Sequence, residues 1–399
     1  MIFFKDPLFQ AQFVRALGHT PSGGADIGEC LQITSAIRDG DRESWYATWE
    51  KKADELQQMA DQSAAAGVAA NARNQYLRAS NYYRSAAIMI EDDPDDPRIL
   101  SSWKLQAGAF RSATRYFSHP VERVGIVFEG EELPGYLYLC SKDKEPRPLL
   151  LLLGGGDGTL EESYFTAAEA VNRGYHCLTF DGPGQGELLR ERRIPFRPDW
   201  ETIVSAAVDF ASSRSEIDAD QIVLMGRSLG GYFAARGASG DQRIAACITD
   251  PGIYDSYETF LKGFPPEGCQ IVENGDPEKI DSYFDTLLAQ NSAVRFKFNL
   301  RMWRYGVQSV RELLEVSKQY TLKGIIEKIT CPMLVLDNEL EYLSKGQARR
   351  LYDALGCPKT YRLFTVDEGA GGHCEPLAAH RFSEVVYGWL EGIKNRRLR

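Results

Sequence analysis

Ser228 stands in the segment Gly226-Arg227-Ser228-Leu229-Gly230-Gly231, directly after the apolar run 221–225. This pattern is typical of a nucleophile elbow, in which a buried strand turns sharply at the serine and a helix follows. Serine at such an apex has strained backbone angles, so its neighbours must be nearly free of side chains. A glycine-rich turn in which the serine is incidental would have the same sequence. The predicted strand before Ser228 and the small-residue helix 230–235 after it favour the nucleophile elbow. The predicted chemistry is nucleophilic attack by the Ser228 hydroxyl.

A serine hydroxyl needs a general base that a third group holds in place. His373 lies after the last predicted strand, in the glycine-rich loop 368–374, which lets an imidazole reach over the edge of a sheet. The other four histidines lie in the helical first half, in a predicted strand or in the last helix: His19, His119, His176 and His380. We therefore predict His373 as the base, the alternative being a histidine that only caps or braces its loop.

The third group should be a carboxylate in the loop after a late strand, between the serine and the histidine in chain order. The strand 332–336 runs into Asp337-Asn338-Glu339-Leu340-Glu341. Glu341 lies at the expected distance beyond the strand, whereas Asp337 is close enough to its end to accept loop amides instead. We rank Glu341 first, Asp337 second and Glu339 third, and any of them could be a solvated loop charge.

Backbone N–H groups should stabilise the negative oxygen that develops during attack. One donor is expected from Leu229, next to the nucleophile, and the second from Gly155 in the glycine run 154–159. A glycine run could also bind a phosphate, but neither G-x-x-x-x-G-K-[ST] nor G-x-G-x-x-G is present, which argues against nucleotide binding.

The two parts of the chain that would position these residues differ in the spacing of their apolar residues. Residues 1–120 have helical spacing, with apolar stripes such as Trp45, Trp49, Ala53, Leu56 and Ala60, and are predicted to form an all-helical domain. We interpret the stripes as packing residues rather than as a ligand-binding aromatic box.

From residue 121 to 399, strands alternate with helices, which predicts an α/β fold with a mostly parallel sheet and helices on both faces. The interval 254–327 breaks this alternation with helix-like, aromatic-rich sequence. It is predicted to be a helical insertion over the carboxyl edge of the sheet and over the active site, because such folds place their sites at that edge.

Composition excludes several classes of protein. The formal net charge is −10, which is opposite to that of a nucleic-acid-binding surface. No apolar run approaches the ~20 residues of a membrane span, and the amino-terminal residues do not resemble a signal peptide. The eight cysteines are scattered without a C-x-x-C pair, which favours free thiols in a reducing cytoplasm and argues against a metal site.

With these motifs in view, the chain resembles a branch of the α/β-hydrolase superfamily. This branch includes 2,6-dihydropseudooxynicotine hydrolase, fungal heptaketide-shortening hydrolases and bacterial fermentation-respiration-switch proteins. The resemblance covers nearly the whole chain. It includes the segments 23–29, 39–41 with 44–45, 82–84, 133–136, 155–159, 181–186, 226–231 and 368–374.

The resemblance implies a serine hydrolase that cleaves a carbon–carbon bond beside a ketone, without a cofactor, in a β-dicarbonyl or polyketide-like aromatic substrate. It also implies that the N-terminal helices form a lid and that the protein is a homodimer. Relatives tend to carry aspartate where this chain has Glu341, which leaves the identity of the acid open. The competing hypotheses are a carboxylesterase or thioesterase with the same triad and a non-catalytic regulatory binding protein.

Overall fold

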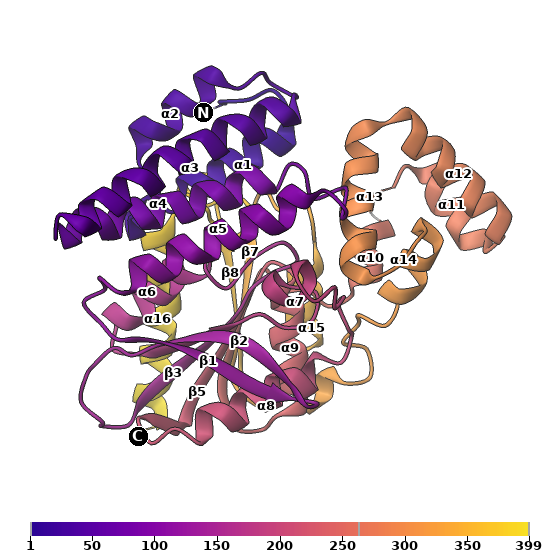
Figure 1. The fold of residues 1–399 in the computed structure, drawn as a ribbon. Coiled ribbons are helices and arrows are strands. Elements are labelled where there is room, and N and C mark those ends of the chain that lie inside the picture. Colours follow the sequence, from indigo (N-terminus) through magenta and orange to yellow (C-terminus); the bar gives the residue numbers. More distant parts are fainter. Residues whose placement is uncertain (1, 262–263, 398–399) are drawn as a thin grey trace.

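A twisted eight-stranded sheet forms the centre of the computed structural model, which describes residues 2–261 and 264–397 (Figure 1). Its strand order is β1-β2-β4-β3-β5-β6-β7-β8. Pairs β1–β2 and β2–β4 are antiparallel and the remaining pairs are parallel. The strands are β1 (Val121–Phe128), β2 (Glu131–Tyr138), β3 (Arg147–Leu153), β4 (His176–Phe180), β5 (Ile217–Arg227), β6 (Ile244–Asp250), β7 (Met333–Asn338) and β8 (Lys359–Phe364).

The sheet is covered by apolar side chains on both faces. Along β3, Leu149, Leu151 and Leu153 pack into one core, and Leu150 and Leu152 pack into the other. The first core includes residues of α8 (Trp200–Ser212), α9 (Gly230–Gly240) and α15 (Gln347–Ala354). The second includes residues of α6 (Tyr164–Asn172) and α16 (Ala379–Arg397). A continuous leucine run is therefore stable as a strand, because neither face meets water.

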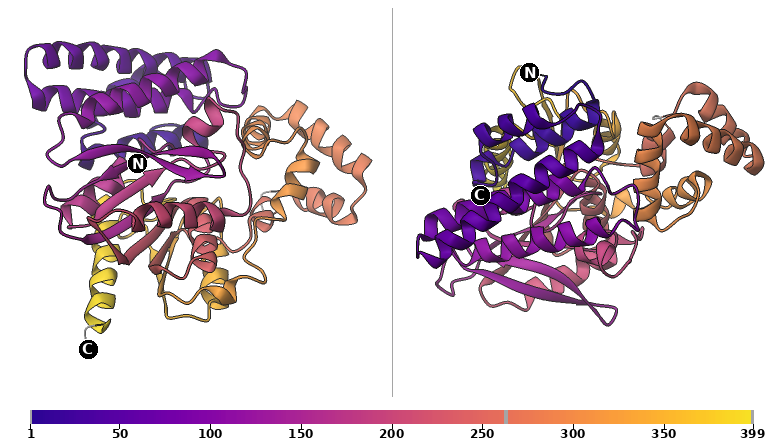
Figure 2. Two further views of the ribbon diagram at one scale, coloured as in Figure 1. Left: turned by 60° about the horizontal axis from the view of Figure 1, so that its bottom comes forward. Right: turned by 45° about the horizontal axis from the view of Figure 1, so that its top comes forward.

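The N-terminal helices form a layer over one end of the sheet (Figures 1 and 2). They are α1 (Pro7–Leu17), α2 (Ile27–Ala36), α3 (Arg42–Ala65), α4 (Ala69–Ala87) and α5 (Pro97–Thr114). Their core contains Trp45, Trp49 and Tyr82, whereas Tyr76 and Phe110 pack into the second core of the sheet. We call this layer the helical region.

The second group of helices projects to one side of the sheet as a separate lobe (Figures 1 and 2). It consists of α10 (Ser256–Leu261), α11 (Pro266–Asn274), α12 (Pro277–Gln290), α13 (Ser292–Tyr305) and α14 (Val310–Ser317). We call this lobe the insertion. It lies within the predicted interval 254–327, and Phe260, Phe284 and Phe298 are buried in it.

The strand–helix alternation expected after residue 120 is present, and the α/β fold with an N-terminal helical region is confirmed. Helix α6 begins only at Tyr164, because residues 160–163 before it form turns, and the Glu162 amide there donates to Thr159 Oγ1. The short helix α7 (Gly186–Arg190) was not predicted. None of the helices in the described ranges is both long and apolar enough to cross a membrane.

Candidate active site

Ser228 lies at the turn between β5 and α9 with a φ of 56°, in the left-handed region that serine rarely adopts. The glycines around it allow this turn. A side chain at Gly226 would collide with the carbonyl of Gly230, and one at Gly231 would collide with the carbonyl of Pro251. The predicted elbow geometry is therefore present, and it presents the Ser228 hydroxyl beyond the carboxyl end of β5.

His373 lies between Ser228 and Glu341. Its Nε2 is 3.0 Å from Ser228 Oγ, and its Nδ1 is 2.6 Å from Glu341 Oε2. The other carboxylate oxygen of Glu341 accepts the amides of Leu343 at 2.8 Å and Ser344 at 3.0 Å. The structure thus brings the three first-ranked residues into one hydrogen-bonded chain, with the serine at the exposed end.

The two lower-ranked acids are engaged elsewhere. Asp337 Oδ2 accepts the Tyr361 hydroxyl at 2.7 Å, and its Oδ1 accepts the Asn338 amide at 2.9 Å. Glu339 accepts the amide of Val366 at 2.7 Å. Each of these carboxylates has a structural partner, and neither is hydrogen-bonded to His373 in the described part of the chain.

The electrostatics of the site favour a charged pair. Burial alone would lower the pKa of His373, but Cys374 and Glu341 outweigh it and raise that pKa well above its ordinary value. Burial would likewise raise the pKa of Glu341, but the hydrogen bond and charge of His373, together with two loop amides, lower it. An ionised Glu341 can therefore stabilise a protonated His373.

Both residues predicted to supply oxyanion donors are neighbours of the serine. Gly155 passes so close that a Cβ added to it would be 2.7 Å from Ser228 Cβ and 3.1 Å from Ser228 Oγ. Gln185 Nε2 donates to the carbonyls of Gly154 and Gly155, both at 2.9 Å, and so fixes residues 154–158, which we call the oxyanion loop. Leu229 is the N-cap of α9, where N–H groups lack intrahelical partners.

Arg227 connects the nucleophile turn to the loop of His373. Its guanidinium donates to the carbonyl of Cys374 and to Thr166 Oγ1, and it packs over the rings of Phe165 and Phe382 at 4.9 Å and 4.6 Å. Asn338 Oδ1 accepts the amide of Cys374 at 3.0 Å. These contacts hold the backbone directly after His373 in a fixed position.

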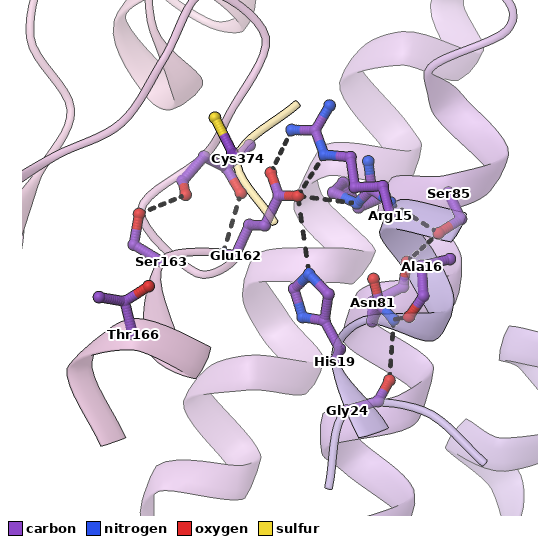
Figure 3. Close-up of polar contacts among 12 residues, drawn as sticks. Arg15, Ala16, His19, Gly24, Asn81, Ser85, Glu162, Ser163, Thr166 and Cys374 are labelled. Carbon is purple, nitrogen blue, oxygen red and sulfur yellow. Dashed lines mark hydrogen bonds and ion pairs between the residues drawn. The ribbon is translucent and has the colours of Figure 1, made fainter. Parts of the chain in front are cut away.

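Arg15 of the helical region binds the oxyanion loop. It donates to both carboxylate oxygens of Glu162, each at 2.6 Å, and to Asp157 at 2.7 Å. Figure 3 shows Arg15 and His19 converging on Glu162, with His19 Nε2 3.7 Å from the carboxylate. The first helix of the chain is therefore joined by ion pairs to the loop that carries the predicted second donor.

Arg15, Asp157, Gln185 and Arg227 were not among the residues singled out from the sequence. Asp157 had a signal, because it lies in the glycine run beside Gly155. Arg15 had none, because its partners are 142 and 147 residues away. In the described ranges, no group of three or more histidine, cysteine or acidic side chains is arranged to hold a metal ion.

Comparisons with known proteins agree with this geometry. Residues 149–385 match the model of the alpha/beta hydrolase family. The chain is 32% identical to the hydrolase acrC of Aspergillus aculeatus, over 98% of this chain and 97% of that protein. It is 36% identical to the 20-hydroxy-prefusarin hydrolase FUS2 of Gibberella moniliformis, over 83% and 82% of the two chains.

Among solved structures, the fold is similar to that of 2,6-dihydroxy-pseudo-oxynicotine hydrolase. The TM-score is 0.74 with 22% identity, and the match covers 94% of this chain and 95% of the other. The similarity spans the helical region, the sheet and the insertion together.

Proposed function

The chain belongs to the alpha/beta hydrolase family, and from this premise we propose that it is a serine hydrolase that cleaves a carbon–carbon bond beside a ketone. The substrate is a β-dicarbonyl or polyketide-like compound with an apolar, aromatic body. The observation that carries the proposal is the continuous hydrogen-bonded chain from Ser228 through His373 to Glu341. It is the arrangement that activates a serine as a nucleophile.

In the first step, His373 takes the Ser228 proton while Oγ forms a bond to one carbonyl carbon of the substrate. The N–H groups of Leu229 and Gly155 stabilise the resulting oxyanion. The carbon–carbon bond then breaks, and its electron pair is delocalised onto the second carbonyl as an enolate. His373 returns its proton to that carbon, so the leaving group departs as a ketone.

In the second step, water hydrolyses the acyl-enzyme. His373 accepts a proton from water, the hydroxide adds to the acyl carbon, and Ser228 leaves with the proton from His373. The products are a carboxylic acid and a ketone. No cofactor takes part in this scheme.

Residues 1–120 serve in this proposal as a lid domain over a catalytic domain of residues 121–399, with the insertion at 254–327 beside the site. The ion pairs of Arg15 with Asp157 and Glu162 support a close association between lid and site. We further propose a homodimer, as the resemblance to the same branch implies, and a cytoplasmic location, which the scattered cysteines without a C-x-x-C pair favour.

A carboxylesterase or thioesterase is the second candidate, because the same triad and oxyanion donors would cleave a better leaving group. A non-catalytic binding protein is a third, but it would have no need for a serine at strained angles in contact with a histidine. The choice between carbon–carbon and ester cleavage depends on the leaving group that the site accepts.

The deciding experiment uses mass spectrometry of products after incubation with an aryl 1,3-diketone and, in parallel, a matched aryl ester. Wild type and Ser228→Ala are compared. Serine-dependent formation of an acid and a ketone from the diketone supports the proposal. Ester cleavage with an unchanged diketone favours the esterase, and equal turnover by both proteins would remove Ser228 from the mechanism.

A further inference from the structure

Two buried carboxyl groups lie behind the triad. Asp250 is the last residue of β6 and is completely buried, and Glu375, two residues after His373, is 2% exposed. Both side-chain oxygens of Asp250 and Oε2 of Glu375 are buried, and within residues 2–261 and 264–397 no N–H or hydroxyl group donates to any of them. Burying a carboxylate without donors is costly, so these three oxygens need an explanation.

Asp250 contacts both the nucleophile turn and the loop of the base. Its backbone carbonyl accepts the amide of Ser228 at 2.6 Å and the Cys374 thiol at 3.3 Å. Its carboxylate Oδ2 lies 3.3 Å from Arg227 Nε. These distances place Asp250 between the nucleophile turn and the backbone that directly follows His373.

Glu375 joins Asp250 to the end of β7. Its Oε1 accepts the side-chain amide of Asn338, whose own Oδ1 accepts the amide of Cys374 at 3.0 Å. The side chains of Glu375 and Asp250 are hydrogen-bonded to each other. A hydrogen bond between two carboxyl groups requires a proton on one of them, because an ionised carboxylate can only accept.

The proton belongs on Glu375 rather than on Asp250. Burial raises the pKa of both groups, but the charges of Arg227 and His373 oppose the rise for Asp250. The pKa of Glu375 is raised well above its ordinary value, first by burial and then by the charge of Asp250. Two further titratable groups act on the pair, one from the loop of the base and one from the loop after β7: Cys374 and Glu341. The arrangement favours a neutral Glu375 beside a charged Asp250.

The backbone at Glu375 is strained. Cys374 and Glu375 have φ values of 57° and 44°, in the left-handed region that residues other than glycine rarely adopt. Two such residues in succession persist only where their surroundings hold them. The Glu375 side chain is held by Asn338 and by Asp250, at the ends of the neighbouring strands β7 and β6. The carboxyl pair therefore restrains the loop two residues after His373.

We propose that Glu375 is a neutral carboxylic acid that donates a hydrogen bond to Asp250 and thereby positions His373 against Ser228. The inference rests on the proposed function and adds to it a positioning residue, which acts through the loop backbone. When Glu375 ionises, two adjacent carboxylates share the guanidinium of Arg227, and their repulsion displaces the loop. Catalysis should therefore have an alkaline limit that Glu375 sets.

The kinetic test follows the labelling of Ser228 by an aryl fluorophosphonate as a function of pH. The serine oxygen bonds to phosphorus, fluoride leaves and the base takes the serine proton, so the rate reports on the triad without requiring carbon–carbon cleavage. Wild type is compared with Glu375→Gln, whose amide can donate to Asp250 at every pH, and with Glu375→Leu, which cannot donate. The control is Glu384→Gln, at an exposed ion pair of α16.

Glu375→Leu should lower the labelling rate by about 10²-fold at every pH, because the base is displaced from the serine. Glu375→Gln should retain most of the rate at neutral pH and should lose the alkaline limb of wild type. Glu384→Gln should match wild type throughout, and thermal unfolding verifies that each variant is folded. An unchanged alkaline limb in Glu375→Gln, or a wild-type rate in Glu375→Leu, overturns the proposal.

A spectroscopic measurement tests the proton without any reaction at Ser228. The infrared difference spectrum between wild type and Glu375→Gln at neutral pH should contain the C=O stretch of a carboxylic acid from wild type. Absence of this band means that Glu375 is ionised, and this result overturns the inference. If wild type has the band but is neither labelled nor active on diketone or ester, the proposed function fails while the neutral Glu375 stands.

Discussion

Glu341 reaches His373 with one methylene more than an aspartate would have. Its second oxygen accepts two consecutive loop amides, which fixes the carboxylate although its side chain is longer. Glutamate at this position can therefore orient an imidazole as well as aspartate can, because the loop compensates for the extra length.

Replacing Glu341 by glutamine should lower kcat by about 10²- to 10⁴-fold, since the imidazole loses the carboxylate that orients it and stabilises its protonated form. The pH profile should change as well. Glu341 raises the pKa of His373, and the base works only when it is neutral, so activity falls at low pH. Without Glu341 the pKa of His373 drops, and the acid limb of kcat/KM moves to lower pH.

Asp337→Asn and Glu339→Gln are the matched controls for this measurement. Their carboxylates accept the Tyr361 hydroxyl and the Val366 amide, and so neither change alters the orientation of His373. Both variants should keep kcat within a few-fold of wild type. A loss in Asp337→Asn as large as that in Glu341→Gln would assign the acid to Asp337.

The sequence contains strong signals for some site residues and none for others. Ser228 and His373 follow strand ends in glycine-rich loops, and this local pattern can be recognised from the amino-acid sequence alone. Arg15 lies in the helix α1, where an arginine usually has no special role. Its significance depends on which side chains the fold places beside it, and that is decided by tertiary packing.

At the scale of elements, the contact between α1 and the oxyanion loop is the most consequential one. The loop is rich in glycine and has little conformational preference of its own. Gln185 holds its carbonyls, and Arg15 holds Asp157 and Glu162. The position of the Gly155 N–H therefore depends on a helix that belongs to a different layer.

Arg15→Met should lower the free energy of unfolding by about 2–4 kcal/mol, because Glu162 is left buried without its bidentate partner. It should also lower kcat more than it raises KM, since the oxyanion donor acts mainly in the transition state. Chemical unfolding and steady-state kinetics measure the two effects. Arg38→Ala, which removes an exposed pair with Asp41, should change neither.

Acid should weaken the same contact over a defined range. Burial would raise the pKa of Asp157, but Arg15 and Arg304 outweigh it and lower that pKa to about 2. Because the pKa of Asp157 is lower in the folded protein than its ordinary value of 3.8, its carboxylate stabilises the folded state at pH values above 3.8. This stabilisation is lost as the pH falls toward 2. In Arg15→Met, the slope of unfolding free energy between these pH values should be smaller than in wild type.

Most helices and strands could be predicted because the periodic spacing of their apolar residues can be recognised in a single sequence. The strand 148–153 is a continuous apolar run, and the stripe from Trp45 to Ala60 repeats every three or four residues. The short helix α7 has no such stripe, and its five residues are placed by contacts of Leu188 and Leu189 in the core. Short elements depend on their surroundings more than on their own sequence.

At the scale of the whole molecule, a buried ion triad joins three parts of the chain. Glu91 follows the helical region's α4, Arg190 belongs to α7, and Arg304 belongs to the insertion's α13. The Glu91 carboxylate binds both arginines, and all three side chains are almost completely buried. The triad therefore fixes the helical region and the insertion relative to the sheet.

Glu91→Gln should destabilise the protein by about 3–5 kcal/mol, since two buried arginines lose their counter-charge. The insertion should become more susceptible to limited proteolysis because α13 loses its anchor. Glu43→Gln, at an exposed pair with Arg98, is the control and should have an effect below about 1 kcal/mol. A stable, protease-resistant Glu91→Gln protein would contradict the anchoring role.

The oligomeric state is a further property of the whole molecule, and a homodimer is expected. Light scattering coupled to gel filtration should give about twice the mass of 44.7 kDa. A concentration-independent mass of one chain would contradict this expectation and would leave the site complete within a single copy.

The long sequence separations within the site also constrain how the protein is made. The ion pairs of Arg15 can form only after residues 157 and 162 have been synthesised, and the contact of Ser228 with His373 only after a further 145 residues. Chains grow from the N-terminus, and domains fold as they emerge. During synthesis the nucleophile turn can therefore fold long before its base exists. On the proposed mechanism, a nascent chain is inactive until β8 and the loop that carries His373 have been translated.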